Sequence, residues 1–324
     1  MPHDYKKGLT QVGKDLYAWM LPDGGWGWSN SGLIVGDGES LVVDTLFDLA
    51  LTKEMLNGYR AVHPTEQIRY VFNTHANGDH YFGNELLKEH AIIVATKAAA
   101  ADMAPHDVQR LEDMKRAAGQ VGDYFRDIFG PFDFSNIQAS GPDIAFDDEL
   151  QINVGGRTVI LKEVGPAHSA GDAVAYVPDE GVVYAGDILF IGGTPIVWAG
   201  PVASWITACD TLIALDADTY VPGHGPVTDK QGVKEVRDYL AFVEDESKQC
   251  FKRGMPINEA ISSIAKNLGR FGGLGDKERL AQNVIHTYKA LDPSVYGDID
   301  PLDAFSAMAA LHGHGKMPDL ERKK

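Results

Sequence analysis

The sequence predicts a mixed α/β fold followed by an all-helical C-terminal region. Two observations lead to this prediction. Up to about residue 228, short apolar runs typical of strands each end in a loop rich in glycine and polar residues. Beyond that point, apolar residues recur only at helical spacing. A chain of 324 residues with 44% hydrophobic content is long enough to bury a core of this kind.

The first predicted elements are a hairpin, a helix and a buried strand. The segment "SGLIVGDGESLVVDT" contains two short strands, 33–35 and 41–43, joined by a turn rich in Gly, Asp and Ser. Asp48 is placed to cap a helix that ends before Pro64. The apolar run "IRYVFNTH" then predicts a buried strand, so His75 follows where a strand ends.

Further apolar runs repeat this arrangement. "AIIVAT" predicts a strand that follows a helix, and the runs in "TVILKEVGPAH", "GVVYAGD" and "DTYVPGH" lead into His168, Asp187 and His224. Strand ends at one rim of a sheet are where α/β folds gather side chains for chemistry. We therefore expect these polar residues to meet at one edge of the fold.

Residues 105–143 interrupt the alternation of strands and helices. They predict one inserted helix followed by an irregular loop rich in Gly, Pro and Phe. A lid over the site and a helix that only covers the sheet explain this segment equally well.

The region after His224 has a different texture. Val233, Val236, Leu240 and Val243 follow helical spacing, Pro256 can open a second helix, and "DKERLAQNVIHTYKALD" and "PLDAFSAMAALHG" suggest two more. The tail "KMPDLERKK" is expected to be disordered. We predict a catalytic domain over residues 1–228 and a helical extension over residues 229–324.

Composition limits the classes of partner and location. The formal net charge is −17, with 46 acidic and 29 basic residues, which disfavours nucleic acid as a partner. Cys209 and Cys250 are the two cysteines, so neither a disulfide framework nor a cysteine-based zinc site is expected. The first residues lack the apolar core of a secretory signal, and no apolar stretch reaches membrane-spanning length. We expect a cytoplasmic protein with a small-molecule substrate, no membrane partner and a helical extension that could form a homo-oligomer.

The segment "NTHANGDHYFGN" concentrates the residues that bind metal. His75, Asp79 and His80 fall in one loop, and Gly78 lets the backbone bend between them. Imidazole and carboxylate are natural ligands for zinc. His168, Asp187 and His224 each lie in a glycine-bearing loop just past a strand, so we expect all six side chains to converge on metal.

The order H-x-[H/N]-x-D-H, then H, D and H, resembles the metallo-β-lactamase superfamily over about residues 15–228. The resemblance implies an αββα sandwich, here with an all-helical extension, and a binuclear zinc centre. One metal would be held by His75, Asn77 and His168, the other by Asp79, His80 and His224, and Asp187 would bridge them. The resemblance further implies that a water or hydroxide between the metals is the nucleophile, with Asp79 orienting it or handling a proton.

Asn77 departs from the pattern that the resemblance implies. A neutral carboxamide oxygen is a poorer zinc ligand than imidazole. Asn77 could ligate through oxygen, act as a hydrogen-bonding neighbour of a weakly held metal, or leave only the Asp79, His80 and His224 site filled. We favour two zinc ions with the first site weaker, and iron or manganese remain possible metals.

Aromatic residues crowd the same loops and suggest the substrate. In the resembling superfamily these loops border the mouth of the site, so an apolar or aromatic substrate is expected. The candidate substrate-binding residues are Trp26, Trp28, Tyr81, Phe82 and Trp198. No basic residue stands beside the motif, although Lys97 and Arg157 are candidates.

The leading hypothesis is a metal-dependent hydrolase of a small, fairly hydrophobic ester, thioester, lactone or activated aryl ether, with Asp79 and Asp187 as catalytic residues. An iron-dependent oxidoreductase or dioxygenase on the same fold is an alternative. A non-catalytic binding descendant, marked by Asn77, is a third.

Overall fold

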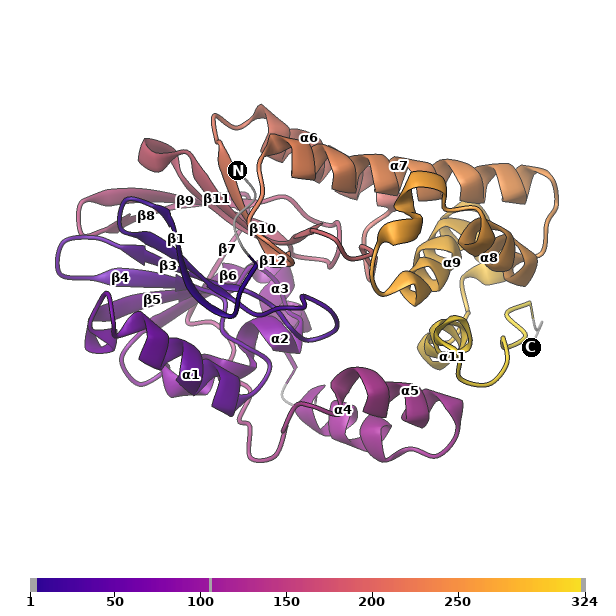
Figure 1. The fold of residues 1–324 in the computed structure, drawn as a ribbon, viewed down its shortest axis with the longest axis horizontal. Helices are drawn as coiled ribbons and strands as arrows, with labels where there is room; N and C mark the ends of the chain where they lie inside the picture. The colour runs from indigo at the N-terminus through magenta and orange to yellow at the C-terminus, as the bar shows by residue number, and fades with distance from the viewer. Residues whose placement is uncertain (1–4, 105–106, 322–324) are drawn as a thin grey trace.

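The computed structural model describes residues 5–104 and 107–321. Within this part of the chain, two β-sheets lie face to face, with helices on both outer sides (Figure 1). The strands are β1 Gly8–Gly13, β2 Leu16–Met20, β3 Ser31–Val35, β4 Ser40–Val43, β5 Ile68–Phe72, β6 Ile92–Thr96, β7 Ile144–Phe146, β8 Glu149–Val154, β9 Arg157–Glu163, β10 Ala173–Val177, β11 Val182–Phe190 and β12 Thr219–His224.

Helices cover the sheets and build the C-terminal region. The α-helices are α1 Leu49–Tyr59, α2 Gly78–Tyr81, α3 Lys97–Asp102, α4 Asp107–Arg116, α5 Gln120–Phe129, α6 Val202–Ala214, α7 Lys230–Lys252, α8 Ile257–Lys266, α9 Leu280–Leu291, α10 Pro293–Tyr296 and α11 Pro301–His312. Short 3-10 helices are η1 Thr65–Gln67, η2 Phe82–Leu86, η3 Pro178–Glu180, η4 Gly269–Gly273 and η5 Lys277–Arg279.

The sheet order explains why distant segments meet at one rim. In the described part of the chain, the first sheet runs β1 to β7 in sequence order and the second runs β12-β11-β10-β9-β8. The predicted hairpin is confirmed, because β3 pairs antiparallel with β4. Strands β4, β5 and β6 are parallel, and so are β11 and β12, so their carboxyl ends point the same way within each sheet.

The core lies between the sheets and beneath the helices. Leu16, Ile34 and Phe72 from the first sheet pack in one cluster with Val159 and Leu161 from the second. A separate cluster joins α1 to the outer face of the first sheet. Asp48 caps α1 as predicted, accepting a hydrogen bond from the Leu51 amide at 2.8 Å. This αββα arrangement with a C-terminal helical region confirms the predicted fold class.

The predicted helices of the C-terminal region form. Val233, Val236, Leu240 and Val243 are all buried on α7, and α8 begins directly after Pro256. Figure 1 shows α7 running from above the second sheet to a group formed by α8, α9 and α11. Since α7 contacts both β11 and α9, it links the two predicted domains; the boundary at residue 228 stays a prediction.

The expectation of a disordered tail is wrong for residues 316–321. The Asn258 side chain donates a hydrogen bond to the Pro318 carbonyl at 2.6 Å, and Leu320 is buried. The Ile257 amide donates to the Glu321 carboxylate at 3.1 Å, which anchors this segment on α8. Residues 322–324 lie outside the described residues.

The inserted segment holds two helices where one was expected, although residues 105–106 lie outside the described residues. Helices α4 and α5 are separated at Gly119, whose φ of +84° prevents one helix from continuing into the other. Helix α5 buries Tyr124, Phe125 and Phe129, and Phe125 packs against Phe305 of α11 with ring centroids 4.9 Å apart. The insertion therefore contacts the C-terminal region, as Figure 1 shows.

Within the described residues, no helix is both long enough and apolar enough to cross a membrane.

Candidate metal centre

The loop after β5 carries the first three site residues. His75 lies between the end of β5 and the short helix α2, Asp79 and His80 lie on α2, and all three are buried. Asp44, directly after β4, fixes this loop: its carboxylate accepts hydrogen bonds from the Thr74 amide at 2.7 Å and from His80 Nδ1 at 2.9 Å. The end of β4 thus orients the loop that follows β5.

The second sheet supplies the other three residues. His168 follows β9, Asp187 lies within β11, and His224 is the last residue of β12. Gly223, beside Asp187, has no space for a side chain, since a Cβ there would lie 2.0 Å from Asp187 Oδ1. The backbone of β12 therefore approaches the carboxylate closely, which brings His224 to the same point.

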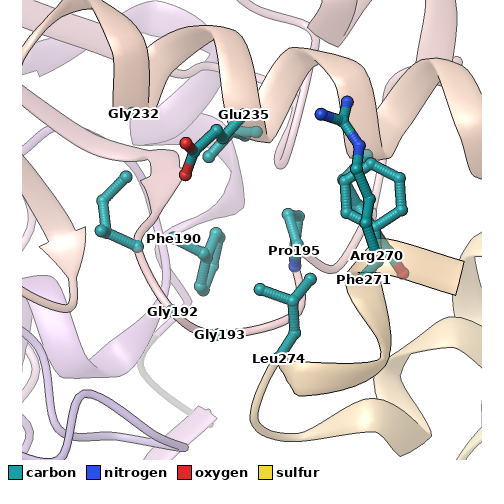
Figure 2. A pocket seen from close by; sticks show the side chains of 12 residues that line it. Phe190, Gly192, Gly193, Pro195, Gly232, Glu235, Arg270, Phe271 and Leu274 are labelled. Atoms are coloured by element: carbon teal, nitrogen blue, oxygen red, sulfur yellow. The ribbon is translucent and has the colours of Figure 1, made fainter. Parts of the chain in front are cut away.

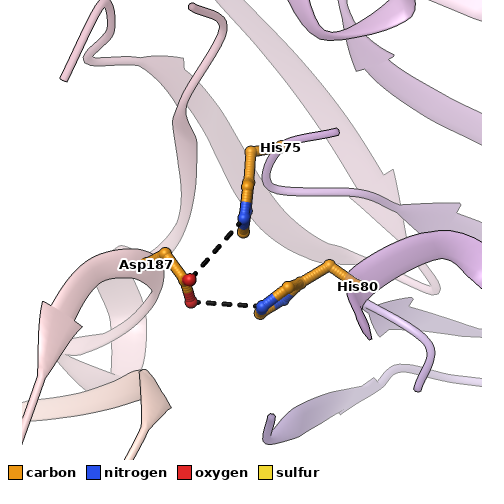
Figure 3. A group of neighbouring side chains, drawn as sticks. All are labelled: His75, His80 and Asp187. Atoms are coloured by element: carbon orange, nitrogen blue, oxygen red, sulfur yellow. Dashed lines mark ion pairs between the residues drawn. The ribbon is translucent and has the colours of Figure 1, made fainter. Parts of the chain in front are cut away.

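Asp187 is the centre of the arrangement. Its carboxylate oxygens lie 3.7 Å from His75 Nε2, 3.1 Å from His80 Nε2, 3.3 Å from His168 Nε2 and 3.5 Å from His224 Nε2. Figure 3 shows His75 and His80 pointing toward this carboxylate from the opposite sheet. Asp79 Oδ2 lies 3.3 Å from His224 Nε2 on the same side. The six side chains meet here from segments far apart in the sequence. The expectation that Asp187 and His224 lie in loops just past a strand is wrong, because both lie on their strands. Their roles as metal ligands stay a prediction.

The imidazoles are prepared as metal ligands. His168 Nδ1 donates to the Ile196 carbonyl at 2.6 Å. The Thr74 hydroxyl donates to Asp44 and thus accepts from His75 Nδ1 at 3.0 Å. With Nδ1 protonated, each Nε2 carries its lone pair toward the centre. Among the described residues, the buried Nε2 atoms of His75, His80 and His168 have no hydrogen-bond partner. Buried nitrogen atoms that lack a hydrogen-bond partner and lie beside carboxylates are suited to bind a metal.

The charges at the centre favour a bound cation. Burial raises the pKa of Asp187, but the four surrounding imidazoles hold it well below its usual value. Burial lowers the pKa of His75 well below its usual range. For His224, the opposing effect of Asp187 outweighs burial and raises the pKa to about 9. Ionised carboxylates among buried imidazoles are the environment that a divalent metal stabilises.

Two groups of atoms could each hold an ion. His75, His80 and Asp187 form one, and Asp79, His80 and His224 form the other, with the ligand atoms of each group within 4.8 Å of one another. The second group is the set predicted for one metal. In the first, His80 replaces His168, which nevertheless lies 3.3 Å from Asp187.

Asn77 sits between the two halves of the loop. It precedes α2 and is half-buried, and among the described residues its side chain makes no capping hydrogen bond to that helix. Its carboxamide is therefore not committed to the helix terminus, and its role as a ligand stays a prediction.

The candidate substrate residues fall into two groups. Trp26, Trp28 and Trp198 are partly exposed, and Trp26 contacts Trp198 with ring centroids 6.4 Å apart. The Trp198 amide donates to the His168 carbonyl at 2.7 Å, which places this aromatic group beside a site residue. Tyr81 and Phe82 are buried, and Phe82 stacks on Phe47. These two rings pack the core, so we leave them out of the proposed substrate surface.

A buried arginine escaped the sequence reasoning. Arg279 is 1% exposed, and its guanidinium lies 4.3 Å from the Trp26 ring and 5.3 Å from the Phe190 ring. Phe190 in turn stacks on His224 at 5.0 Å. The two basic candidates named from the sequence lie elsewhere: exposed Lys97 pairs with Asp147, and Arg157 faces Glu180 at 3.7 Å. Arg279 is the last residue of the 3-10 helix η5. Apolar residues at α-helical spacing therefore did not indicate that it is buried beside Trp26 and Phe190.

A cavity of about 270 Å³ lies beside the centre (Figure 2). Phe190, Pro195, Tyr239, Phe271 and Leu274 line it. Phe190 therefore contacts both this cavity and His224. The described lining residues include none of the six site residues, so the cavity adjoins the centre without containing it.

Comparison with known proteins agrees with this geometry. The family described as the metallo-beta-lactamase superfamily matches residues 24–224. The chain belongs to this superfamily, which confirms the resemblance seen in the motif order. Proteins of this superfamily bind metal ions, and the His/Asp groups described above could hold one.

Curated relatives are more distant. The chain is 25% identical over 228 residues to the 2,4-dinitroanisole O-demethylase subunit alpha of Nocardioides sp., covering 68% of this chain and 59% of that protein. It is 28% identical over 135 residues to a linear primary-alkylsulfatase of Pseudomonas sp., covering 38% and 25%. A hydroxyacylglutathione hydrolase of Brucella ovis is 26% identical over 195 residues, with 59% of each chain covered. The chain thus spans less than two thirds of each of these relatives.

Solved structures show the same fold. A double mutant of the sec-alkyl sulfatase PisA1 from Pseudomonas sp. matches with a TM-score of 0.69 at 16% identity, covering 91% of this chain and 52% of that one. A metallo-beta-lactamase family protein from Thermus thermophilus gives a TM-score of 0.58 at 19% identity, covering 82% and 90%.

Proposed function

We propose that this protein is a metal-dependent hydrolase of a small, fairly hydrophobic substrate. The observation that carries the proposal is the convergence of four imidazole Nε2 atoms within 3.7 Å of the Asp187 carboxylate. The family match and the hydrolase names of two curated relatives support it.

We propose that the centre binds two zinc ions. His75, Asn77 and His168 would hold the first and weaker ion, Asp79, His80 and His224 the second, and Asp187 both. When bound, the metals supply Lewis-acid activation of water and stabilise negative charge that develops on the substrate.

The side chains of this chain then have separate tasks. Asp79 is 8% exposed, whereas His75 and His80 are 0% exposed, so its carboxylate is the site group best placed to orient or accept a proton from a reacting water. Asp44 holds His80 in the tautomer that ligates through Nε2. Phe190, stacked on His224, excludes water from one side of the centre.

The surroundings suggest a substrate with an aromatic or apolar body and a polar group. Trp26, Trp28 and Trp198 offer aromatic surfaces, and the Arg279 guanidinium, which pairs with Asp276 at 3.0 Å, lies against the Trp26 ring. An activated aryl ether or an ester suits this surface best. Two relatives, a dinitroanisole O-demethylase and an alkylsulfatase, support a substrate of this kind, because dinitroanisole is an activated aryl ether and an alkyl sulfate is an ester.

The test combines elemental analysis with a substrate screen. Protein purified without a histidine tag should contain at least two zinc ions and cleave substrates from a panel of aryl esters, lactones and activated aryl methyl ethers. His80→Ala and Asp187→Ala should lose at least about a thousandfold in kcat/KM, whereas His90→Ala, at an exposed histidine, should match the wild type.

Each alternative predicts a different result. Iron as the native metal, with oxygen consumed, would replace hydrolysis by redox chemistry. Less than one metal per chain and no turnover across the panel would indicate a binding protein. Unchanged turnover in both site variants would refute the assignment of these residues.

A further inference from the structure

A second group of metal-ligand residues lies outside the buried centre. Asp127 of α5, His312 at the end of α11 and His314 just beyond it each offer a ligand atom within 4.8 Å of the others. We propose that these three residues form a second divalent-metal site, of the zinc type, that ties the inserted helix α5 to the C-terminal helix α11.

The backbone holds the two histidines side by side. Helix α11 ends at His312, and Gly313 has a φ of +110°, a conformation that suits glycine. The His314 amide then donates to the Ala309 carbonyl at 2.8 Å. As a result, the two imidazole rings stack with centroids 5.6 Å apart and an interplanar angle of 6°. Both donors are therefore presented together by one turn.

Helix α5 is fixed against this turn. The Gln120 side chain donates to the Ser306 carbonyl at 3.2 Å and accepts from the Lys316 amide at 3.1 Å. His314 Nε2 lies 2.7 Å from Asp127 Oδ2 across the same contact. The carboxylate and this imidazole thus come from positions 187 residues apart in the sequence, yet meet in one place.

The donor set matches the chemistry of zinc. Two imidazoles and a carboxylate are a common three-ligand set, with water as the fourth ligand. Ligand atoms around a tetrahedral zinc ion lie roughly 3.3–3.6 Å apart, so small rotations of the side chains close the set. The Asp127 side chain is 56% exposed and that of His312 34%, which leaves both accessible to an ion from solvent.

The position of this site links it to the mouth of the buried centre. His312 Nδ1 lies 3.5 Å from Glu278 Oε1, and the same oxygen accepts hydrogen bonds from Trp26 Nε1 at 2.8 Å and Tyr124 OH at 3.2 Å. An ion held by His312 would therefore steady α5, α11 and the tryptophan at the mouth together. The proposal does not depend on the proposed function, because it concerns a different set of ligands.

The test is metal stoichiometry in untagged protein. Zinc titration against a competing chelator should show one more equivalent bound by the wild type than by His312→Ala/His314→Ala. His90→Ala should bind as many as the wild type, since His90 is exposed outside the cluster. Asp127→Asn, a milder change at the surface, should keep the fold and weaken the additional site at least about tenfold.

A second measurement follows the structural consequence. Zinc should slow proteolysis between residues 104 and 143 in the wild type and in His80→Ala, but not in His312→Ala/His314→Ala. Equal zinc stoichiometry in the wild type, Asp127→Asn and the folded double variant would overturn the proposal. In that case the His314–Asp127 contact is an ion pair only.

Discussion

Asn77 is the residue at which this chain departs from the motif pattern that the resemblance implies. It is half-buried between His75 and Asp79, and its side chain does not cap α2 among the described residues. The local backbone therefore does not require asparagine at this position, and a role as a metal ligand is the hypothesis to test.

The substitution Asn77→His tests this role. Because imidazole is a better donor to zinc than a carboxamide, the weaker metal should be retained about tenfold more tightly against a chelator. Asn77→Ala is the matched control and should retain it less well than the wild type. Metal content after dialysis measures both, and identical retention in all three proteins would contradict a ligand role.

Asp172 shapes the loop that carries His168. Its Oδ2 accepts hydrogen bonds from the Ala167 amide at 3.1 Å and the Ser169 amide at 2.8 Å. Burial raises the pKa of Asp172 from 3.8 to about 7, although these hydrogen bonds oppose the shift. The loop geometry therefore depends on a carboxyl group that is costly to ionise.

This shift predicts a pH dependence in the metal-free protein. When the pKa of a carboxyl group is higher in the folded state than in the unfolded chain, the folded state keeps its proton at pH values where the unfolded chain has lost it. The free energy of unfolding then decreases as the pH rises between the two pKa values. The contribution of Asp172 to the free energy of unfolding should therefore fall as pH rises from 5 to 8. In Asp172→Asn the change in the free energy of unfolding from pH 5 to pH 8 should be more favourable than in the wild type by about 2 kcal/mol.

Urea unfolding of the metal-free wild type and of metal-free Asp172→Asn at pH 5 and pH 8 measures these free energies of unfolding. Asparagine can still accept from both amides, so the variant should fold. Asp172→Ala removes both acceptors and should be destabilised at either pH. A pH effect identical in wild type and Asp172→Asn would show that Asp172 does not titrate in this range.

At the scale of elements, the contact between α5 and α11 fixes the position of the inserted segment. Phe125 is 2% exposed and lies between Phe129 and Phe305, with centroids 5.4 and 4.9 Å away. Tyr124 of the same helix contacts Trp26 at the mouth. The segment that was equally compatible with a lid and with a helix covering the sheet therefore contains a helix docked on the C-terminal region, and a role as a lid stays a hypothesis.

Phe125→Ala should loosen this docked helix. Loss of a buried phenylalanine typically costs about 3–5 kcal/mol, and here the cost falls on the contact between the two segments. We expect faster proteolysis between residues 104 and 143 with little change in metal content. Leu302→Ala on α11 is the control, because Leu302 is 52% exposed. Equal cleavage rates in both variants would mean that Phe125 does not hold the insertion.

At the scale of the whole molecule, the candidate centre draws its residues from both sheets. The first sheet provides His75 and His80, and the second provides His168, Asp187 and His224. Without a metal, the buried imidazoles and carboxylates contact one another with several Nε2 atoms unpaired among the described residues. A metal bound at this centre would therefore also cross-link the two layers.

Removal of metal should therefore lower stability as well as activity. A ligand that binds only the folded state stabilises it by about 4 kcal/mol at a thousandfold excess over its Kd. We expect a chelator to lower the thermal unfolding midpoint by several degrees, and added zinc to restore it. The unfolding midpoint of His80→Ala should change less when the chelator is added. If the chelator left the midpoint of the wild type unchanged, a tightly bound metal that stabilises the fold would be contradicted.

Much of the fold and the centre could be predicted because the signals are local. Apolar runs identify β5, β11 and β12, and the polar residues at their ends follow within a few positions. The break at Gly119, which divides the insertion into two helices, was missed because a single glycine inside a helical pattern is an ambiguous signal. The tail was misjudged because its polar composition hides the buried Leu320.

By itself, the sequence determined which side chains are available as metal ligands and that they follow strand ends, because these depend on residue type and short spacing. Only the tertiary structure decided that Asp44 orients His80, that Arg279 lies beneath Trp26, and that Asp127 meets His314. The first of these pairs is separated by 36 positions in the sequence and the last by 187. Their formation depends on how whole layers pack, and no local pattern encodes that packing.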